Sequence, residues 1–268
     1  MRTTMIKQLC RLFVTLLICF STTTYADKID EVIESGSLTV GVSLFEPWTM
    51  QDEAGQLSGF EIDVAKNIAQ EMGVTPEFVV YDWEDIIPAL EKGEIDLIAG
   101  GMAITPARAL RVSYSQPYAE SGITLATNIE STKHIKELDE LDQPEIVFAV
   151  ISQAKSAEVI KRIFKRATVR EFVSVKEAQQ AVISGKAHAY AGSSPQPEFL
   201  ALRNPEIIDM PLSKPLVAYQ AGLGVQKGNQ EWLNFLNAWI VSRTADKWLP
   251  TTHKHWFKSL NWFEEPKS

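Results

Sequence analysis

Residues 97–111 read LIAGGMAITPARALR, and this stretch decides how the chain builds its functional site. Its apolar start predicts a buried strand that ends at a pair of glycines. Thr105 is then predicted to cap a helix, with Pro106 at the first helical position, where its missing N–H costs nothing. Arg108 follows in the first turn of this helix.

Arg108 is placed beside the unsatisfied N–H groups and the positive end of the helix dipole. A cation there is unfavourable for the helix alone. It is favourable if an anion shares the site, because a guanidinium binds a carboxylate through two parallel hydrogen bonds. The alternative is an arginine that extends into solvent or pairs with a nearby acid. The stretch therefore predicts either a carboxylate site or a surface arginine.

The N-terminus has the three parts of a secretory signal. Three basic residues lie within the first 11, residues 12–20 are predominantly apolar, and Thr24-Tyr25-Ala26 is a small-residue cleavage site. The apolar run is too short to span a bilayer permanently. A lipoprotein signal ending at Cys19 is the alternative, but the isoleucine before this cysteine fits poorly. We expect cleavage after Ala26 and export to the periplasm.

Composition narrows the classes of function. Both cysteines, Cys10 and Cys19, lie in the signal, so the mature chain of about 240 residues has no thiol for catalysis or metal binding. A chain of this length can bury a sufficient core without disulfides. The formal net charge is −8, and removing a signal with three basic residues and no acid leaves about −11. This charge argues against nucleic acid or anionic membranes as partners and leaves small molecules.

Hydrophobic patterning predicts two similar α/β units. The first has strands at 38–42, 75–81 and 97–99 and helices at 30–35, 64–72 and 83–92. The second has strands at 145–151, 169–173 and 187–191 and helices at 156–166 and 175–184. Strands that alternate with helices at these lengths are typical of parallel sheets.

An internal repeat supports this division. Residues 89–101 (ALEKGEIDLIAGG) and 181–193 (AVISGKAHAYAGS) match in apolar and polar pattern at an offset of 92 residues without a gap. The tail has a different pattern: a strand at 221–226, a helix at 230–243 and a helix at 247–257 broken at Pro250. We expect this tail to return and pack on the first unit.

Short motifs occur in a characteristic order: GSLTVG at 36–41, PW at 47–48, GFEIDVA at 59–65, IIPAL at 86–90, GEID at 93–96, ITPAR at 104–108, YSQPY at 114–118 and KGN at 227–229. Together they resemble the polar amino-acid-binding branch of the bacterial periplasmic solute-binding proteins that serve ABC transporters, family 3. The resemblance implies a monomer that uses no cofactor, binds a small carboxylate solute and delivers it to a membrane permease.

The resemblance also implies a fold of two α/β lobes that close around a ligand, joined by crossover strands near 119–127 and 214–222. We expect lobe one to comprise residues 27–120 with 220–268, and lobe two residues 121–219.

Four site residues are implied by position in these motifs. Arg108 matches the arginine that binds the ligand α-carboxylate, and Gly101 the residue whose carbonyl accepts from the ligand ammonium. Phe45 and Trp83 match apolar positions that sandwich the ligand side chain. The alternative for both aromatics is a purely structural role, as a loop anchor and a core residue.

Three departures from the family pattern complicate the ligand. Ala103 stands where many relatives have a hydroxyl that donates to the carboxylate, and Ser193 where the family has the acid that pairs with the ammonium. Lys155, beside the lobe-two turn, suits a second anionic group or is a solvated loop residue. One hypothesis is an amino-acid receptor that uses another acid, such as Glu46 or Glu120. The other is a receptor for a carboxylate without an α-ammonium.

Other functions on this fold have weaker support. Periplasmic dehydratases of cyclohexadienyl acids share it, but no positioned acid or base is evident. His188 matches Asp96 in the repeat, which favours a structural role. His253 and His255 lack a third ligand, so we expect no metal site. A sensor input domain or an accessory protein of a periplasmic dehydrogenase is a further alternative.

Overall fold

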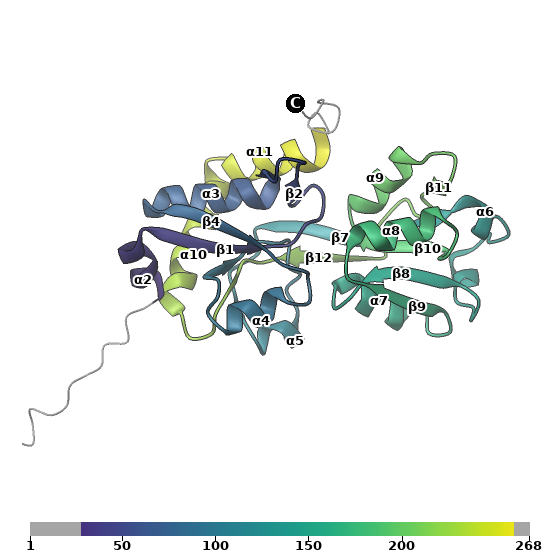
Figure 1. Ribbon diagram of the computed structural model, residues 1–268, viewed down its shortest axis with the longest axis horizontal. Coiled ribbons are helices and arrows are strands. Elements are labelled where there is room, and N and C mark those ends of the chain that lie inside the picture. The colour runs from purple at the N-terminus through teal and green to yellow at the C-terminus, as the bar shows by residue number, and fades with distance from the viewer. Residues whose placement is uncertain (1–27, 260–268) are drawn as a thin grey trace, which may run out of the picture.

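The computed structural model describes residues 28–259, so the predicted signal lies outside the described residues. Two larger sheets, each with helices on both faces, form two lobes (Figure 1). A small hairpin pairs β2 (Met50–Gln51) with β3 (Leu57–Ser58). The predicted two-lobe α/β fold is confirmed. Within the described range, no helix combines the length and apolar character needed to cross a membrane.

The first lobe contains the five-stranded sheet, in the order β4-β1-β5-β13-β6. Its strands are β1 (Ser37–Val42), β4 (Thr75–Val80), β5 (Leu97–Ile98), β6 (Ser113–Tyr114) and β13 (Gly224–Val225). Strand β1 is parallel to β4 and β5, whereas β13 is antiparallel to β5 and β6. Buried apolar residues join one face of the sheet to α2 (Lys28–Ser35), α3 (Phe60–Met72), α10 (Gln230–Ala245) and α11 (Trp248–Lys254). The other face packs on α4 (Ile86–Glu91), next to the short α5 (Pro106–Ala109).

The second lobe contains a mixed sheet in the order β11-β7-β10-β8-β9, with β12 also paired to β7. Its strands are β7 (Ala119–Asn128), β8 (Val147–Ile151), β9 (Thr168–Phe172), β10 (Ala189–Ser193), β11 (Ile208–Asp209) and β12 (Val217–Ala221). One face packs on α7 (Lys155–Ile163), and the other on α8 (Val175–Ile183) and α9 (Gln196–Arg203). The short helices α6 (Ile129–Thr132) and η1 (Leu138–Leu141) lie between β7 and β8 in the chain.

Two strands carry the chain between the lobes, as predicted. Strand β7 leaves the first lobe and β12 returns, and the two run side by side in Figure 1. They pair antiparallel over the full length of β12, from Val217 opposite Ile123 to Ala221 opposite Ala119. The tail then returns to the first lobe, where Trp232, Leu236 and Trp239 of α10 join the core.

The internal repeat has a structural counterpart. The backbone N–H of Asp96 donates to the carbonyl of Thr39 at 2.8 Å, and the N–H of His188 donates to that of Val147, also at 2.8 Å. Each side chain accepts in return: Asp96 Oδ2 from Thr39 N at 2.9 Å, and His188 Nδ1 from Val147 N at 3.1 Å. Both residues thus hold the strand that follows them beside the first strand of their unit, and the predicted structural role of His188 is confirmed.

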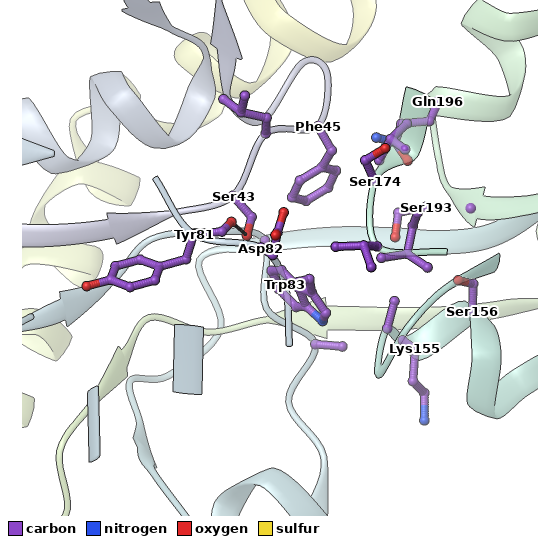
Figure 2. Close-up of a pocket in the computed structure, with 18 of the residues that line it drawn as sticks. Ser43, Phe45, Tyr81, Asp82, Trp83, Lys155, Ser156, Ser174, Ser193 and Gln196 are labelled. Atoms are coloured by element: carbon purple, nitrogen blue, oxygen red, sulfur yellow. Dashed lines mark hydrogen bonds between the residues drawn. The ribbon is translucent and has the colours of Figure 1, made fainter. Parts of the chain in front are cut away.

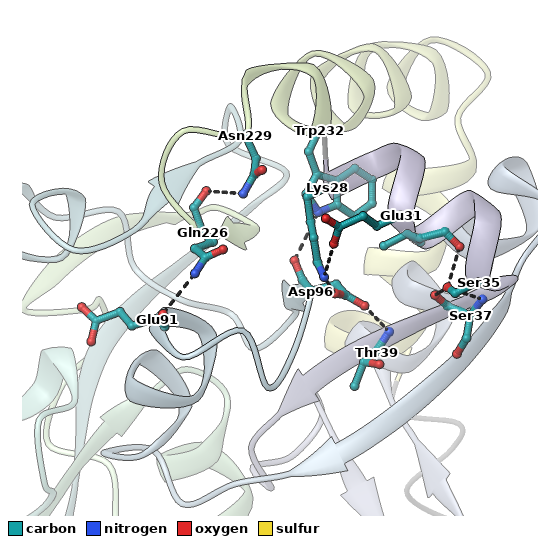
Figure 3. A network of polar contacts seen from close by, with 11 residues as sticks. Lys28, Glu31, Ser35, Ser37, Thr39, Glu91, Asp96, Gln226, Asn229 and Trp232 are labelled. Atoms are coloured by element: carbon teal, nitrogen blue, oxygen red, sulfur yellow. Dashed lines mark hydrogen bonds and ion pairs between the residues drawn. The ribbon is translucent and has the colours of Figure 1, made fainter. Parts of the chain in front are cut away.

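Asp96 makes further contacts in the first lobe. Its Oδ1 forms an ion pair with Lys28 of α2 at 3.0 Å, and its carbonyl accepts from Trp232 Nε1 of α10 at 3.2 Å (Figure 3). The residue therefore links α2 and α10 to the sheet.

Three sequence predictions differ from the structure. Helix α3 begins at Phe60 rather than Val64, because the carbonyls of Pro47 and Trp48 accept from its first N–H groups and replace a side-chain cap. Pro250 does not break α11, since it lies in the first turn, where no intrahelical N–H is needed. Helix α9 was not predicted at all.

We expect Asp96→Ala to lower the free energy of unfolding by about 1–3 kcal/mol, because it leaves the Thr39 N–H without its acceptor and removes one of the two acids that pair with Lys28. Urea denaturation measures this loss. Glu53→Ala, at an exposed acid in the turn between β2 and β3, is the control and should change little. Equal stabilities for the two variants would contradict the assigned role.

Candidate functional site

A cavity of about 170 Å³ lies between the two lobes, at the carboxyl ends of the parallel strands. The first lobe contributes the segments after β1, β4 and β5, and the second the segments after β8 and β10 (Figure 2). All seven residues singled out in the sequence line it: Phe45, Trp83, Gly101, Ala103, Arg108, Lys155 and Ser193. Their contact with a ligand stays a prediction.

Arg108 is held by neutral groups. Thr105 caps α5 and accepts from the Arg108 N–H at 3.3 Å, as predicted. The guanidinium lies over the Trp83 ring, 5.3 Å from its centroid, and donates to the carbonyls of Ala103 at 3.2 Å and Gln153 at 2.9 Å. Among the described residues, no carboxylate forms an ion pair with it. Burial lowers the pKa of Arg108 from its ordinary value, but an arginine stays protonated in proteins. The cavity thus presents a positive charge that no acid of the described chain pairs with.

Gly101 has a conformation that a side chain would not permit. Its φ is +58°, and a Cβ there would lie 2.8 Å from the Trp48 ring. Its N–H donates at 2.6 Å to Oε1 of the buried Glu61, which also accepts from the Tyr118 hydroxyl at 2.5 Å. Glu61 therefore fixes the peptide that carries this cavity residue.

Glu61 is a neutral acid in this setting. Burial raises its pKa to about 8, although the hydrogen bonds from Tyr118 and Gly101 act in the opposite direction. In the sequence this residue stands out only as part of the GFEIDVA motif at 59–65. An acid among the apolar residues at the start of α3 was the available signal.

Phe45 and Trp83 form an apolar corner of the cavity. Their ring centroids are 6.1 Å apart and their planes nearly perpendicular. Phe45 stacks on the buried Trp48, with centroids 5.8 Å apart, and this contact sets its orientation. Both rings are half-buried, so each has a surface available to a ligand.

The second-lobe wall is polar and neutral. The Ser193 hydroxyl accepts from the Tyr219 hydroxyl at 2.8 Å, and Gln196 Oε1 accepts from the Tyr190 hydroxyl at 2.7 Å. Gln196 is almost fully buried, and its Nε2 has no hydrogen-bond partner in the protein. Gln196 was missed in the sequence because α9 was not predicted. Lys155 pairs with Glu158 at 2.7 Å.

Neither of the acids proposed to replace Ser193 lines the cavity. Glu46 forms an ion pair at 2.6 Å with Arg203 of α9, a contact between the lobes. Glu120 on β7 accepts from Gln220 at 3.5 Å, and its side chain is exposed. Neither Glu46 nor Glu120 is thus placed in the cavity wall, and the hypothesis that another acid takes the place of the family acid at Ser193 stays a prediction. The acid that does line the cavity is Asp82, beside Trp83, which no sequence motif indicated as a site residue.

The sequence of the chain matches a known protein family over nearly all of the described residues. A family model described as bacterial extracellular solute-binding proteins, family 3, matches residues 38–259. The chain belongs to this family. Among curated members, the L-cystine-binding protein TcyJ of Escherichia coli (strain K12) is 23% identical over 247 residues, covering 91% of this chain and 92% of TcyJ.

Solved structures agree with the family assignment. A binding component of an ABC transporter from Wolinella succinogenes DSM 1740, complexed with lysine, is 30% identical with a TM-score of 0.79, covering 86% of this chain and 99% of that one. An ancestral amino-acid-binding protein, AncCDT-1, a precursor of cyclohexadienyl dehydratase, is 33% identical with a TM-score of 0.78, covering 87% and 100%.

One relative of this family-3 chain is an enzyme. Cyclohexadienyl dehydratase of Pseudomonas aeruginosa is 20% identical, and the match covers 86% of each chain. Other similar proteins, TcyJ and the Wolinella succinogenes protein among them, are named for transport or binding. Within residues 28–259, no group of three His, Cys, Asp or Glu side chains is placed to hold a metal ion. His253 instead stacks on Phe257, with ring centroids 4.4 Å apart.

We expect Glu61 to make stability depend on pH. Its carboxyl keeps a proton in the folded state up to about pH 8, whereas the unfolded chain releases it near the ordinary value of 4.5. Stability contributed by this group is therefore complete below about pH 4.5 and falls as the pH rises to about 8, by at most about 1.4 kcal/mol per pH unit.

Glu61→Gln should remove this slope, so wild type loses stability relative to the variant between pH 5.5 and 8. Urea denaturation at several pH values measures the difference. Glu77→Gln, at an exposed acid of β4, is the control and should keep the wild-type slope. Parallel profiles for wild type and Glu61→Gln would show that Glu61 titrates as an ordinary acid.

Proposed function

We propose that this chain is the periplasmic solute-binding component of an ABC uptake system. It is exported, loses its signal after Ala26 and acts as a monomer that presents its solute to a membrane permease. The solute is a small carboxylate, most simply an amino acid, as the names of the relatives support. The single observation that carries the proposal is the Arg108 guanidinium, charged and without an acidic partner, in a cavity between two lobes.

Binding is proposed to draw together lobe one, residues 27–120 with 220–268, and lobe two, residues 121–219. Two contacts favour the closed arrangement. Arg108 donates to the Gln153 carbonyl from across the cleft, and Glu46 pairs with Arg203. A carboxylate on Arg108 would neutralise the guanidinium while this lobe-two carbonyl stays in place. Ligand binding and closure thus use the same side chain.

Chemistry on the bound solute is not part of the proposal. The one acid that lines the cavity is exposed Asp82, and no histidine lines it. General acid–base catalysis needs a group held at the reacting atom. Mass spectrometry of the solute before and after incubation tests this directly, and conversion would favour an activity like that of the dehydratase relative.

We expect Arg108→Ala to abolish the rise in melting temperature that a bound solute produces. Wild type is screened by thermal shift against amino acids, keto acids and dicarboxylates, and a saturating ligand should add a few kcal/mol. Arg111→Ala is the matched control, because Arg111 pairs with Glu91 at 2.5 Å and does not line the cavity. An unchanged shift in Arg108→Ala would contradict the proposed site.

We expect Glu46→Gln to release solute faster without loss of fold. The ion pair with Arg203 is partly exposed, so its loss should speed dissociation by about two- to fivefold. Stopped-flow tryptophan fluorescence measures the rate. Glu130→Gln, which removes an ion pair with Lys133 inside lobe two, should leave it unchanged. Equal rates for both variants would show that the Glu46 contact does not hold the lobes together.

A further inference from the structure

The ionic groups around the cavity are few. Among its lining residues, Arg108 and Lys155 are the cations and Asp82 is the only acid. The Lys155 ammonium pairs with Glu158, which does not line this cavity, and Figure 2 shows it directed away from the other labelled side chains. One cation, Arg108, and one anion, Asp82, therefore remain for a ligand.

Asp82 is well placed to meet a ligand. It follows β4, at the carboxyl end of a parallel strand, and immediately precedes Trp83. It lines the same cavity as Phe45 and Trp83, the two aromatic residues of the first lobe (Figure 2). Its side chain is exposed, and within residues 28–259 its carboxylate has neither an ion pair nor a hydrogen bond. It is thus an unpaired charge next to an apolar surface.

The opposite wall contributes no negative charge. Ser193 is engaged with Tyr219 and Gln196 with Tyr190, and the remaining polar side chains from lobe two are the serines Ser156 and Ser174 together with Lys155. The cationic group of a ligand would find hydroxyls and amides there but no counter-charge. Desolvating such a group without a partner costs several kcal/mol.

We infer that the solute is a zwitterion whose carboxylate binds Arg108 and whose ammonium or guanidinium group binds Asp82. This inference rests on the proposed function and specifies its ligand. Ser193 stands where the family has the acid that pairs with the ligand ammonium. In this inference Asp82 of lobe one supplies that negative charge instead. Both ionic contacts then lie on the first lobe, and the second lobe adds neutral hydrogen bonds as it closes.

The test compares Asp82→Asn with Asp85→Asn by isothermal titration calorimetry. Asp85 is an exposed acid three residues further along the same segment that does not line the cavity. The probes are L-α-amino acids, ω-amino acids such as 5-aminovalerate, and amine-free pentanoate and glutarate. We expect a zwitterion to bind wild type, and Asp82→Asn to weaken it about tenfold while Asp85→Asn does not. The affinities of the α-amino acids and the ω-amino acids, compared with each other, show whether the ligand carries its cationic group beside the carboxylate or at the far end of its carbon chain.

A second variant tests the charge itself. Asp82→Asn combined with Ser193→Asp returns one carboxylate to the cavity from the other lobe, and should recover part of the lost affinity. Tighter binding of pentanoate or glutarate than of any zwitterion, or unchanged affinity in Asp82→Asn, would overturn the inference.

These outcomes separate the two proposals. If binding depends on Arg108 but not on Asp82, the zwitterion inference fails and the solute-binding function stands. If no carboxylate binds at all, or if Arg108→Ala binds as wild type does, the proposed function fails and the inference fails with it.

Discussion

The cleft depends on one arginine whose charge the described chain orients but does not pair with an acid. Backbone carbonyls from Ala103 and Gln153 and the face of Trp83 direct the Arg108 guanidinium. Dipoles and a π-surface hold a cation in place and leave its charge available to an anion. A carboxylate partner from the protein would have filled the same position. The neutral surroundings of Arg108 are therefore what make the cavity an anion site.

The duplicated fold brings the other groups to this arginine. In each lobe, a residue before the third strand of the unit, Asp96 or His188, ties that strand to the first one. The segments that follow the parallel strands then emerge on one side and meet across the cleft. Behind the cavity, Glu61 holds the Gly101 peptide. An acid with a pKa near 8 does this without adding a negative charge at neutral pH.

Sequence was sufficient where the signals were local. Thr105 and Pro106 start α5, Gly73 ends α3 in the left-handed conformation, and the repeat aligned His188 with Asp96. The resemblance in motif order also identified seven residues that line the cavity. These successes rest on capping, hydrophobic period and resemblance.

Contacts between distant segments were beyond such signals. Helix α3 begins before the predicted residue because the backbone carbonyls of Pro47 and Trp48 accept from its first N–H groups. Helix propensities do not include such contacts with a distant loop. The side chain of Glu46 pairs with Arg203, 157 residues away in the chain, and no local signal reports such a contact. Asp82 went unnoticed because exposed acids are common, and only the cavity lining sets it apart.

The pairing of β7 with β12 has a mechanical consequence. The crossovers are joined by a continuous ladder of hydrogen bonds and form a single two-stranded ribbon. Such a ribbon resists stretching and sliding, because either motion would break the ladder, but it twists readily. Any motion of the lobes that leaves the ladder intact keeps the two crossover strands in register, so the two walls of the cleft meet in the same alignment each time they close.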